Sequence, residues 1–295
     1  MVHVKKSKED KRFDFIVYTI AILMIIITLY PMYFVLIASV SDPVLVSSGE
    51  VMFWPKGFNI KAYEKLAGYP KLWVGYRNTV LYVIVGTIVT LLVNIPVSYA
   101  LSRKRLYGKK LFVAFYMIPM FFSGGLIPTY LAVKQFHLLD TFWVLVIPFS
   151  VATYYIIVGR TFFLNSIPDD LWEAAQLDGC GYGAFFIKVV LPLSKAVIAV
   201  IALWSAVGQW NAYFNALIYI RQDQLQPLQI ILRNILISNQ NISTMMTGST
   251  ASEMRKSADL IKYAVIVVSS APIMCMYPFV QKYFNQGVML GSLKG

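Results

Sequence analysis

The chain has 295 residues, of which 58% are hydrophobic and 14% are charged, and it carries a net charge of +12 at pH 7. Soluble domains contain about 25% charged residues, so this composition predicts a protein whose solvent is a membrane. The Lys and Arg residues stand between apolar runs rather than along one soluble face, which argues against nucleic-acid binding. Two cysteines, Cys180 and Cys275, and two histidines, His3 and His137, lack the spacing of a disulfide framework or a zinc site.

Six intervals without charged residues each reach or exceed the roughly 18 residues that cross a bilayer as a helix. A helix is expected in each, because it satisfies every backbone polar group internally. The first interval is about twice as long as the apolar part of a signal peptide and no cleavage site follows it, so it is expected to be retained. The sequence therefore predicts an all-α polytopic membrane protein with a six-helix transmembrane domain over 15–281. The predicted spans are 15–41, 78–102, 111–133, 141–159, 196–220 and 263–281.

Basic residues near the span ends predict the orientation, because short cytoplasmic loops are rich in Lys and Arg. The N-terminal segment 1–14 and the turn 103–110 carry five basic residues each, whereas the turn 134–140 carries one. Both termini, including the C-terminal tail 282–295, are therefore expected in the cytoplasm with the loop 160–195. The segments expected to face outward are 42–77, 134–140 and 221–262.

Two helices are predicted in the outward segments. The stretch "NIKAYEKLAG" (59–68) has Asn59 as a candidate cap and Gly68 as a terminator. Apolar residues between Leu228 and Leu236 recur at helical spacing, which predicts an amphipathic helix on the outer membrane face or against a partner. The polar stretch 238–254 is expected to be a mobile loop.

The third span contains "MFFSGGLIPTYL", in which Gly124, Gly125 and Pro128 weaken or kink a helix. Such residues are common in membrane helices, so a tolerated kink is one interpretation. The other is a hinge or a close crossing with a second helix. The sequence leaves both open.

A polar, turn-rich insert, "DDLWEAAQLDGCGYGAFFIKVVLP" (169–192), separates the fourth and fifth spans. It predicts a helix capped by Ser166 and ended by Gly179, then a second helix over 182–190. Interfacial helices usually carry Lys and Arg on the polar face, but "DDLWEAAQLDG" has only acidic charges. This favours contact with a soluble partner over packing on the bundle alone.

Within this insert, "EAAQLDG", nine residues and "VVLP" resemble the EAA loop of the permease subunits of bacterial ABC importers. An aspartate at 178 is typical of the sugar-transporting branch. Cys180 departs from the pattern, where a small Ala is more usual. The segments 100–111, 208–220 and 277–295 resemble MalG-like permeases, and 122–131 resembles the branch that serves pectin-, xylan- and alginate-type oligosaccharides. The residues that match the EAA pattern are Glu173, Ala174, Ala175, Gly179, Val189, Leu191 and Pro192.

The resemblance implies an ABC type I importer permease fold with a cytoplasmic EAA coupling helix, in a bacterial cell membrane. It implies a second homologous permease subunit, a dimer of ATPase subunits that bind ATP and Mg, and an extracellular or periplasmic solute-binding protein that delivers a sugar. The chain lacks a G-x-x-x-x-G-K-[ST] phosphate loop, so it is expected to be a transport subunit without an ATPase site or a cofactor of its own. The residues expected to dock the ATPase subunit are Glu173, Ala174, Ala175, Asp178 and Gly179.

Polar and aromatic residues cluster near the outer end of the fifth span. Polar side chains inside a membrane usually face the bundle interior, and amides with aromatic rings suit the surfaces of a sugar. Hydrogen bonds between helices and an aromatic belt are the competing explanation. The candidate pathway residues are Gln209, Trp210, Asn211, Tyr213 and Asn215.

Other functions compete with a sugar permease, and one of them, a purely structural partner subunit, overlaps with it. A permease for another delivered solute would share the same motifs. A secondary transporter would usually place ionisable residues within its spans, and the six predicted spans contain none. A membrane-embedded enzyme is disfavoured, because no carboxylates cluster within the spans and no nucleophile motif is present.

Overall fold

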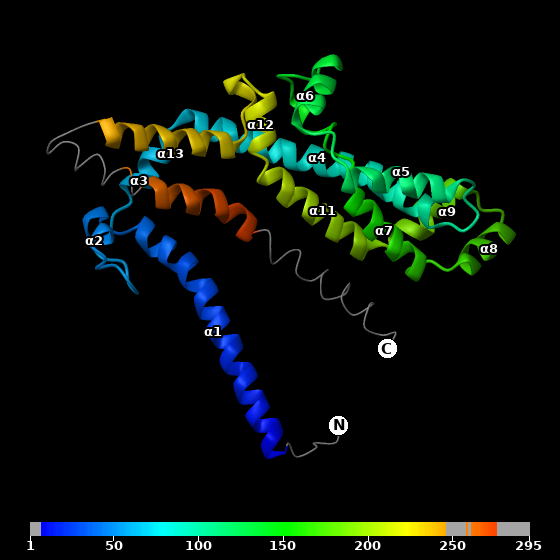
Figure 1. Ribbon diagram of the computed structural model, residues 1–295, viewed down its shortest axis with the longest axis horizontal. Helices are drawn as coiled ribbons and strands as arrows, with labels where there is room; N and C mark the ends of the chain where they lie inside the picture. Colours follow the sequence, from blue (N-terminus) through cyan, green and yellow to red (C-terminus); the bar gives the residue numbers. More distant parts are fainter. Residues whose placement is uncertain (1–6, 246–257, 259–260, 276–295) are drawn as a thin grey trace. The chain divides into compact units, whose positions relative to one another are not determined.

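The computed structural model describes residues 7–245, 258 and 261–275, and these residues form helices joined by turns, with no β-strand among them. The all-α prediction is confirmed. The chain divides into two units (Figure 1): residues 1–69 with 234–271, and residues 70–233 with 272–295. The predicted C-terminal tail 282–295 and the last six residues of the sixth predicted span lie outside the described residues.

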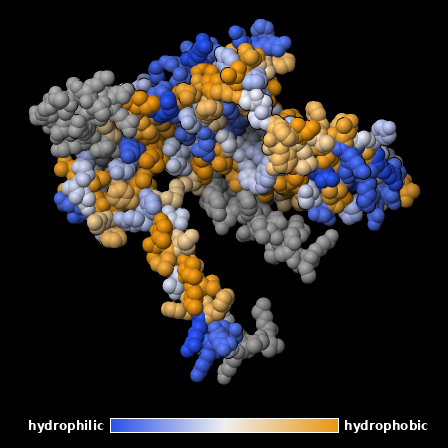
Figure 2. Space-filling model, in the orientation of Figure 1, coloured by the Kyte–Doolittle hydropathy of each residue, from blue (hydrophilic) through white to orange (hydrophobic). Residues whose placement is uncertain are grey.

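The first unit is built around α1 (Lys8–Ser39). Ser7 caps it by accepting a hydrogen bond from Glu9 N at 3.3 Å, and Asp10 Oδ2 accepts one from Ser7 N at 2.9 Å. The helix is long and apolar enough to cross a membrane. Most of its apolar side chains are exposed, and its middle is apolar in the surface view (Figure 2). An exposed apolar surface is what lipid contact requires.

Short helices follow α1. They are α2 (Pro43–Ser47) and α3 (Lys61–Ala67), and Asn59 Oδ1 accepts a hydrogen bond from Lys61 N at 2.9 Å at the start of α3. The predicted helix is confirmed over Lys61–Ala67 with Gly68 at its end, but Ile60 and not Asn59 holds the N-cap position. The apolar helix Ile261–Cys275 covers the first part of the sixth predicted span, and Tyr263 packs edge-on against Phe34 of α1, with ring centroids 6.0 Å apart.

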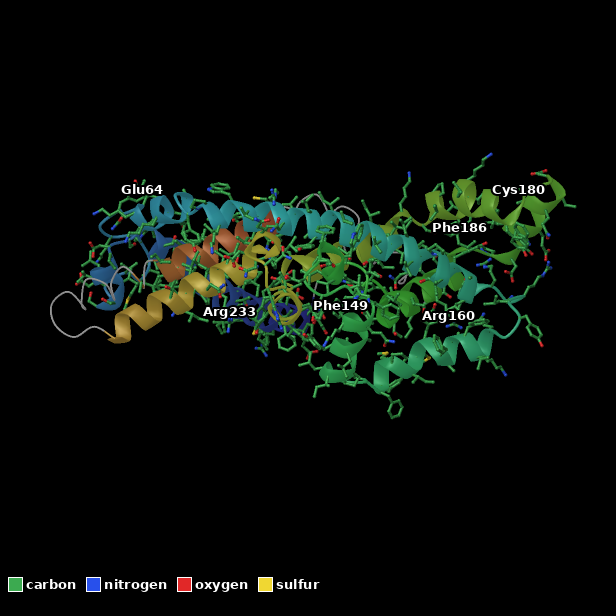
Figure 3. The ribbon with its side chains drawn as sticks, turned by 90° about the horizontal axis from the view of Figure 1, so that it is seen from above. Glu64, Phe149, Arg160, Cys180, Phe186 and Arg233 are labelled. Atoms are coloured by element: carbon green, nitrogen blue, oxygen red, sulfur yellow. The ribbon has the colours of Figure 1, made fainter. Side chains whose placement is uncertain are left out.

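The second unit is organised along α4 (Pro70–Ser102), which packs against two other helices. These are α7 (Thr153–Ser166) and α11 (Lys195–Trp210). In Figure 3, Cys180 and Phe186 mark the end of the unit where the insert lies, and Phe149 lies farther along it. The remaining elements are α5 (Lys109–Phe121), α6 (Leu126–Gln135), η1 (Phe142–Leu145), α8 (Asp169–Leu177), α9 (Tyr182–Phe185), η2 (Phe186–Val190), α10 (Leu191–Leu193), α12 (Phe214–Tyr219), η3 (Asp223–Leu225) and the first turns of α13 (Leu228–Met245), whose residues from Asn234 onward belong to the first unit.

Three predicted spans are not single helices. The third, 111–133, consists of α5 and α6, which are bent by 118° at the break that contains Gly124 and Gly125. The fourth, 141–159, has a 3₁₀ turn and irregular backbone before α7 begins at Thr153. The fifth, 196–220, breaks between α11 and α12 at residues 211–213. Among the described helices, only α1 and α4 are each long and apolar enough to cross a membrane alone. If each of the two bent helix pairs is counted as one span, the described residues contain up to four spans.

The insert continues into α11 through a second bent pair. Residues Tyr182–Leu193 form one helical segment that meets α11 at 79°. Its middle, η2, is a π-helical turn in which Leu191 N donates to Phe186 O. Pro192 follows and has no N–H for an ordinary helical bond to Lys188, which accounts for the widened turn. The second predicted helix, over 182–190, is confirmed.

The helix α13 begins against α4 of the same chain. Leu228 N donates to Thr79 Oγ1 at 2.8 Å, and a Cβ on Gly75 would lie 2.6 Å from Ile231 Cδ1. The first turns of α13 therefore pack their apolar residues against α4. For these turns, the prediction of a helix on the outer membrane face or against a partner is wrong. Residues 238–245 are helical and belong to α13, so no loop forms there, and residues 246–254 of the predicted stretch lie outside the described residues.

Candidate functional site

The helix α8 carries the residues of the EAA resemblance. Its stretch "LWEAAQL" consists largely of strong helix formers, and Asp169 and Asp170 occupy its first turn, where carboxylates stabilise the helix dipole. Ser166 was expected to cap α8, but it is the last residue of α7. Ile167 precedes a proline and leaves the helical region, so Pro168 occupies the cap position without a side-chain hydrogen bond.

Gly179 ends the helix as predicted. It has φ +73°, Cys180 N donates to Ala175 O at 2.9 Å, and Gly179 N donates to Gln176 O at 3.0 Å. This pair of bonds is a Schellman motif, which needs a left-handed residue and therefore favours glycine. The turn returns the chain towards α9.

Trp172 anchors α8 to the core of the second unit. It is 7% exposed, stacks on Tyr182 with ring centroids 4.2 Å apart, and meets the edge of Phe185 at 5.2 Å. It belongs to a buried cluster with side chains of α4, α7 and α11, among them Ile95, Phe163 and Ile201. Its Nε1 is buried and has no hydrogen-bond partner among the described residues. Trp172 therefore joins α8 to a buried cluster that α4, α7 and α11 share.

A second attachment is electrostatic and involves the basic turn (residues 103–110). Arg103, whose side chain is 17% exposed, lies 3.4 Å from Asp169 and donates to Ile167 O at 3.1 Å. Lys104 Nζ also lies 3.3 Å from Asp169 Oδ2, and Arg105 lies 3.1 Å from Glu173 Oε1. The acidic side of α8 thus faces basic residues of the same chain. Figure 2 shows the hydrophilic surface gathered at this end of the unit.

The structure places all five predicted docking residues on α8 and its C-terminal turn. Ala174, Asp178 and Gly179 are exposed. Ala175 is half-buried against the core cluster, and Glu173 is exposed but paired with Arg105. Sequence reasoning missed Arg103 and Trp172. The run of basic residues was the available signal for Arg103, and the tryptophan on a short helix with three carboxylates was the signal for Trp172.

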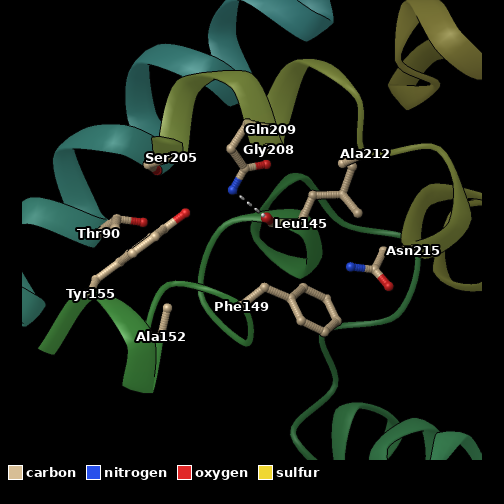
Figure 4. Close-up of a pocket in the computed structure, with 10 residues that line it drawn as sticks. All are labelled: Thr90, Leu145, Phe149, Ala152, Tyr155, Ser205, Gly208, Gln209, Ala212 and Asn215. Atoms are coloured by element: carbon tan, nitrogen blue, oxygen red, sulfur yellow. Dashed lines mark hydrogen bonds between the residues drawn. The ribbon is translucent and has the colours of Figure 1, made fainter. Parts of the chain in front are cut away.

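A small cavity of about 140 Å³ lies among α4, α7, α11 and the broken fourth span (Figure 4). Two predicted pathway residues, Gln209 and Asn215, line it, and Gln209 Nε2 donates to Leu145 O at 3.2 Å. A Cβ on Gly86 would lie 2.7 Å from Gln209 Nε2, so glycine lets α11 and its glutamine approach α4. Other lining residues are Thr90, Phe149, Ala152, Tyr155, Ser205, Gly208 and Ala212.

The other three predicted pathway residues do not line this cavity. Trp210 is 5% exposed and its ring lies 6.2 Å from that of Tyr76. Asn211 donates to Val207 O of its own helix at 2.9 Å, and Tyr213 is 44% exposed. The structure therefore brings two of the five together.

Asn94 is a site residue that the sequence analysis overlooked. It is fully buried, its Nδ2 donates to Ser150 O at 2.7 Å, and its Oδ1 accepts from Ala152 N at 3.1 Å. These bonds satisfy the irregular backbone beside the cavity. An asparagine in the middle of an apolar span was the available signal.

The predicted hinge lies at the break between α5 and α6. Gly125 has φ +85°, and Pro128 stands in the first turn of α6. A Cβ on Gly124 or Gly125 would meet no described atom within 4 Å, so these glycines do not serve a close crossing between the helices that the structure describes. The hinge itself stays a prediction. No three His, Cys, Asp or Glu side chains among the described residues could hold a metal ion.

The arrangement defines a helical membrane protein with a short helix attached to its bundle at one end. Residues 72–290 match the family of binding-protein-dependent transport system inner membrane components, and the chain belongs to that family.

Two proteins of Bacillus subtilis (strain 168) are similar over most of the chain. Protein LplC is 36% identical over 269 residues, which cover 91% of this chain and 90% of LplC. The polygalacturonan/rhamnogalacturonan transport system permease protein YtcP is 35% identical over 291 residues, which cover 97% of this chain and 100% of YtcP. A crystal structure of a bacterial ABC transporter involved in the import of the acidic polysaccharide alginate contains a similar chain. The TM-score is 0.85 at 29% identity, covering 95% of this chain and 99% of that chain.

Proposed function

We propose that the chain is a permease subunit of an ATP-driven importer of oligosaccharides derived from a complex polysaccharide, in a bacterial inner membrane with both termini in the cytoplasm. Family membership and the relatives that serve pectin-type and alginate substrates support the class. The structural observation that carries the proposal is the attachment of α8 to the bundle core through Trp172. In this proposal a dimer of ATPase subunits supplies ATP hydrolysis with Mg, and a solute-binding protein delivers the sugar.

The attachment of α8 gives a route from the ATPase subunits to the membrane helices. A displacement of α8 moves Trp172, which belongs to the same buried cluster as Phe163 of α7 and Ile201 of α11. The core is close-packed, so such a displacement is passed on as a rigid-body movement and not absorbed locally. Closure of the ATPase dimer would then switch the spans between inward- and outward-facing states.

The cavity at Gln209 and Asn215 is the proposed part of the sugar pathway in this chain. Its amide, hydroxyl and aromatic side chains suit a saccharide. Its volume of about 140 Å³ is below the roughly 300 Å³ at which ligand pockets begin. The pathway is therefore narrow here, and we infer that it widens during transport and is completed by a second permease subunit.

Uptake by cells tests this function. A strain that lacks the gene for this chain should lose ATP-dependent uptake of its labelled oligosaccharide and regain it with the wild-type gene. Uronate-containing and neutral oligosaccharides should be compared side by side, because the relatives include carriers of acidic polysaccharides. Uptake that persists after the partner ATPase loses its phosphate-loop lysine would show that the chain does not serve an ATP-driven importer.

A further inference from the structure

Two basic side chains from different helices meet at the C-terminal end of α4. Lys109, the first residue of α5, donates from Nζ to Ser102 O at 3.2 Å, and Arg160 of α7 donates from Nε to Leu101 O at 3.2 Å. In Figure 3, Arg160 lies towards the end of the unit that carries the insert. Neither side chain forms an ion pair with a carboxylate of the described residues. Two cations therefore converge on two successive carbonyl groups.

The positive charge at this place is not balanced. Asp169, a nearby carboxylate, already pairs with both Arg103 and Lys104, at 3.4 and 3.3 Å. Burial lowers the pKa of Lys109, and repulsion from Arg160 and Arg103 lowers it further. Asp169 acts in the opposite direction and offsets only part of this effect. A further anion bound here would therefore meet a favourable field.

Both side chains retain N–H groups for such an anion. An ammonium and a guanidinium each carry several donors, and one bond from each is formed with the end of α4. Lys109 and Arg160 are half-buried, so they are held in place and remain open to the surface. A guanidinium fork fits two oxygens of one phosphate, and an ammonium adds a point charge beside it. The pair can therefore hold a phosphate group.

Exposed apolar side chains continue from Lys109 along α5. Phe112 follows three residues later on the same side of the helix and is 49% exposed, and Phe115, a further three residues on, is 69% exposed. Before Lys109, Tyr107 is 96% exposed and has the polar tip typical of residues at a membrane surface. A ligand on this side of α5 would meet cations at one end and aromatic rings at the other.

We propose that Lys109 and Arg160 bind the phosphate of an anionic phospholipid, whose acyl chains lie along Phe112 and Phe115. Basic residues between membrane helices are a recurring type of site for such headgroups. An acidic surface of a soluble protein suits this place less, because it would leave the two phenylalanines uncovered. The inference goes beyond the proposed function, since it needs only that this end of α5 lies at a membrane surface.

Lipid binding by the purified, full-length chain tests this site. The chain in neutral detergent is titrated with phosphatidylglycerol or with phosphatidylcholine, and native mass spectrometry measures the lipid bound per protein. Lys109→Gln and Arg160→Gln should each weaken phosphatidylglycerol binding about fivefold, and the double variant about thirtyfold, as expected for the loss of one and two charges near the surface. Binding of phosphatidylcholine should not change.

Charge-preserving and distant variants serve as controls. Lys109→Arg keeps the positive charge and should bind phosphatidylglycerol within about twofold of wild type. Lys188→Gln removes an exposed lysine of η2 and should have little effect. The thermal midpoint without added lipid should stay close to wild type in both glutamine variants, because a glutamine amide can still donate to a carbonyl of α4. A lower midpoint with an unchanged lipid preference would show a purely structural role and overturn the proposal.

The wild-type chain gives a test that does not depend on any variant. Its binding of phosphatidylglycerol should exceed its binding of phosphatidylcholine and should weaken as salt is added. Equal binding of the two lipids would overturn the proposal even if neither glutamine variant folds. Displacement of the lipid by inorganic phosphate at matched ionic strength would identify a free anion as the ligand and exclude the lipid.

A protein partner is the remaining alternative occupant. If Lys109→Gln loses a co-purifying subunit while its lipid preference is unchanged, the two cations belong to a protein interface and the lipid site is wrong. Sugar uptake enters none of these lipid measurements. The proposed function can therefore fail while the lipid site stands, and the reverse also holds.

Discussion

Asn94 of α4 and Ser150, fifty-six residues later, are joined by a hydrogen bond of 2.7 Å from Nδ2 of the asparagine to the backbone oxygen of the serine. The same side chain accepts a hydrogen bond from Ala152 N. One side-chain amide therefore bonds the backbone oxygen of Ser150 and the backbone N–H of Ala152, in the irregular segment that precedes α7. Because an unsatisfied backbone group in a membrane costs several kcal/mol, this side chain makes the break tolerable.

Replacing Asn94 by alanine is expected to destabilise the protein by about 3 kcal/mol, because it leaves buried backbone groups without partners. The thermal midpoint in detergent should fall. Asn211→Ala is the matched control: Asn211 is exposed and bonds only within its own helix, so its loss should change stability by less than about 0.5 kcal/mol. Equal effects at the two positions would contradict the structural role of Asn94.

Gly159→Ala is expected to disturb the contact between α7 and α4. Its Cβ would lie 2.6 Å from Ser98 Oγ and 2.8 Å from Ser98 Cβ, so the two helices must separate, at about 1–3 kcal/mol. Adding Ser98→Gly should recover part of the loss. Gly208→Ala, whose Cβ would meet nothing within 4 Å, should be neutral or stabilising by up to about 1 kcal/mol. The measured thermal midpoint should be highest for Gly208→Ala, intermediate for the double variant, and lowest for Gly159→Ala.

Substitutions of Trp172 should separate the contribution that ring packing makes to stability from the contribution of the indole N–H. Trp172→Ala removes the anchor of α8 and is expected to cost about 3 kcal/mol or more of stability. Trp172→Phe keeps an aromatic ring and removes the buried Nε1–H, which has no partner in the part of the chain that the structure describes, so stability should stay within about 1 kcal/mol of wild type. Protection of the α8 backbone amides from hydrogen exchange should fall in the alanine variant alone. A large loss in the phenylalanine variant would show that the indole nitrogen has a partner in the assembled importer.

Asp140 predicts a pH dependence of stability. Hydrogen bonds from the backbone N–H groups of Gln222 and Arg221, at 2.9 and 2.8 Å, hold the pKa of Asp140 below its usual value of 3.8. Because folding lowers this pKa, the ionised carboxylate stabilises the folded protein at pH values above the usual pKa of 3.8. This contribution is lost as the pH falls through the lower folded pKa. The thermal midpoint should therefore drop as the pH falls below the usual value of 3.8.

The control for Asp140 is Asp140→Asn. Asparagine tolerates the left-handed backbone at this position, where φ is +59°, but it cannot ionise. The variant should be less stable than wild type at neutral pH by about 1 kcal/mol, and the difference should shrink in acid. A difference that is constant with pH would rule out the carboxylate as its cause.

The sequence by itself determined the class of protein and the local form of the insert. Charge-free intervals predict membrane helices, because a bilayer excludes charges over a known thickness. The helix α8, its Gly179 terminator and the helix that begins at Tyr182 follow from propensity, glycine geometry and a motif within one short stretch.

Only the tertiary structure decided where the spans break and which partner each polar side chain takes. The bonds from Asn94 to Ser150 and from Gln209 to Leu145 join residues 56 and 64 positions apart, so no local pattern contains them. The same is true of Glu173, whose charge is visible in the sequence but whose neighbour, Arg105, lies 68 positions away. An apolar composition predicts a membrane helix, because a helix satisfies its own backbone hydrogen bonds in lipid. Contacts between helices decide whether that helix is continuous.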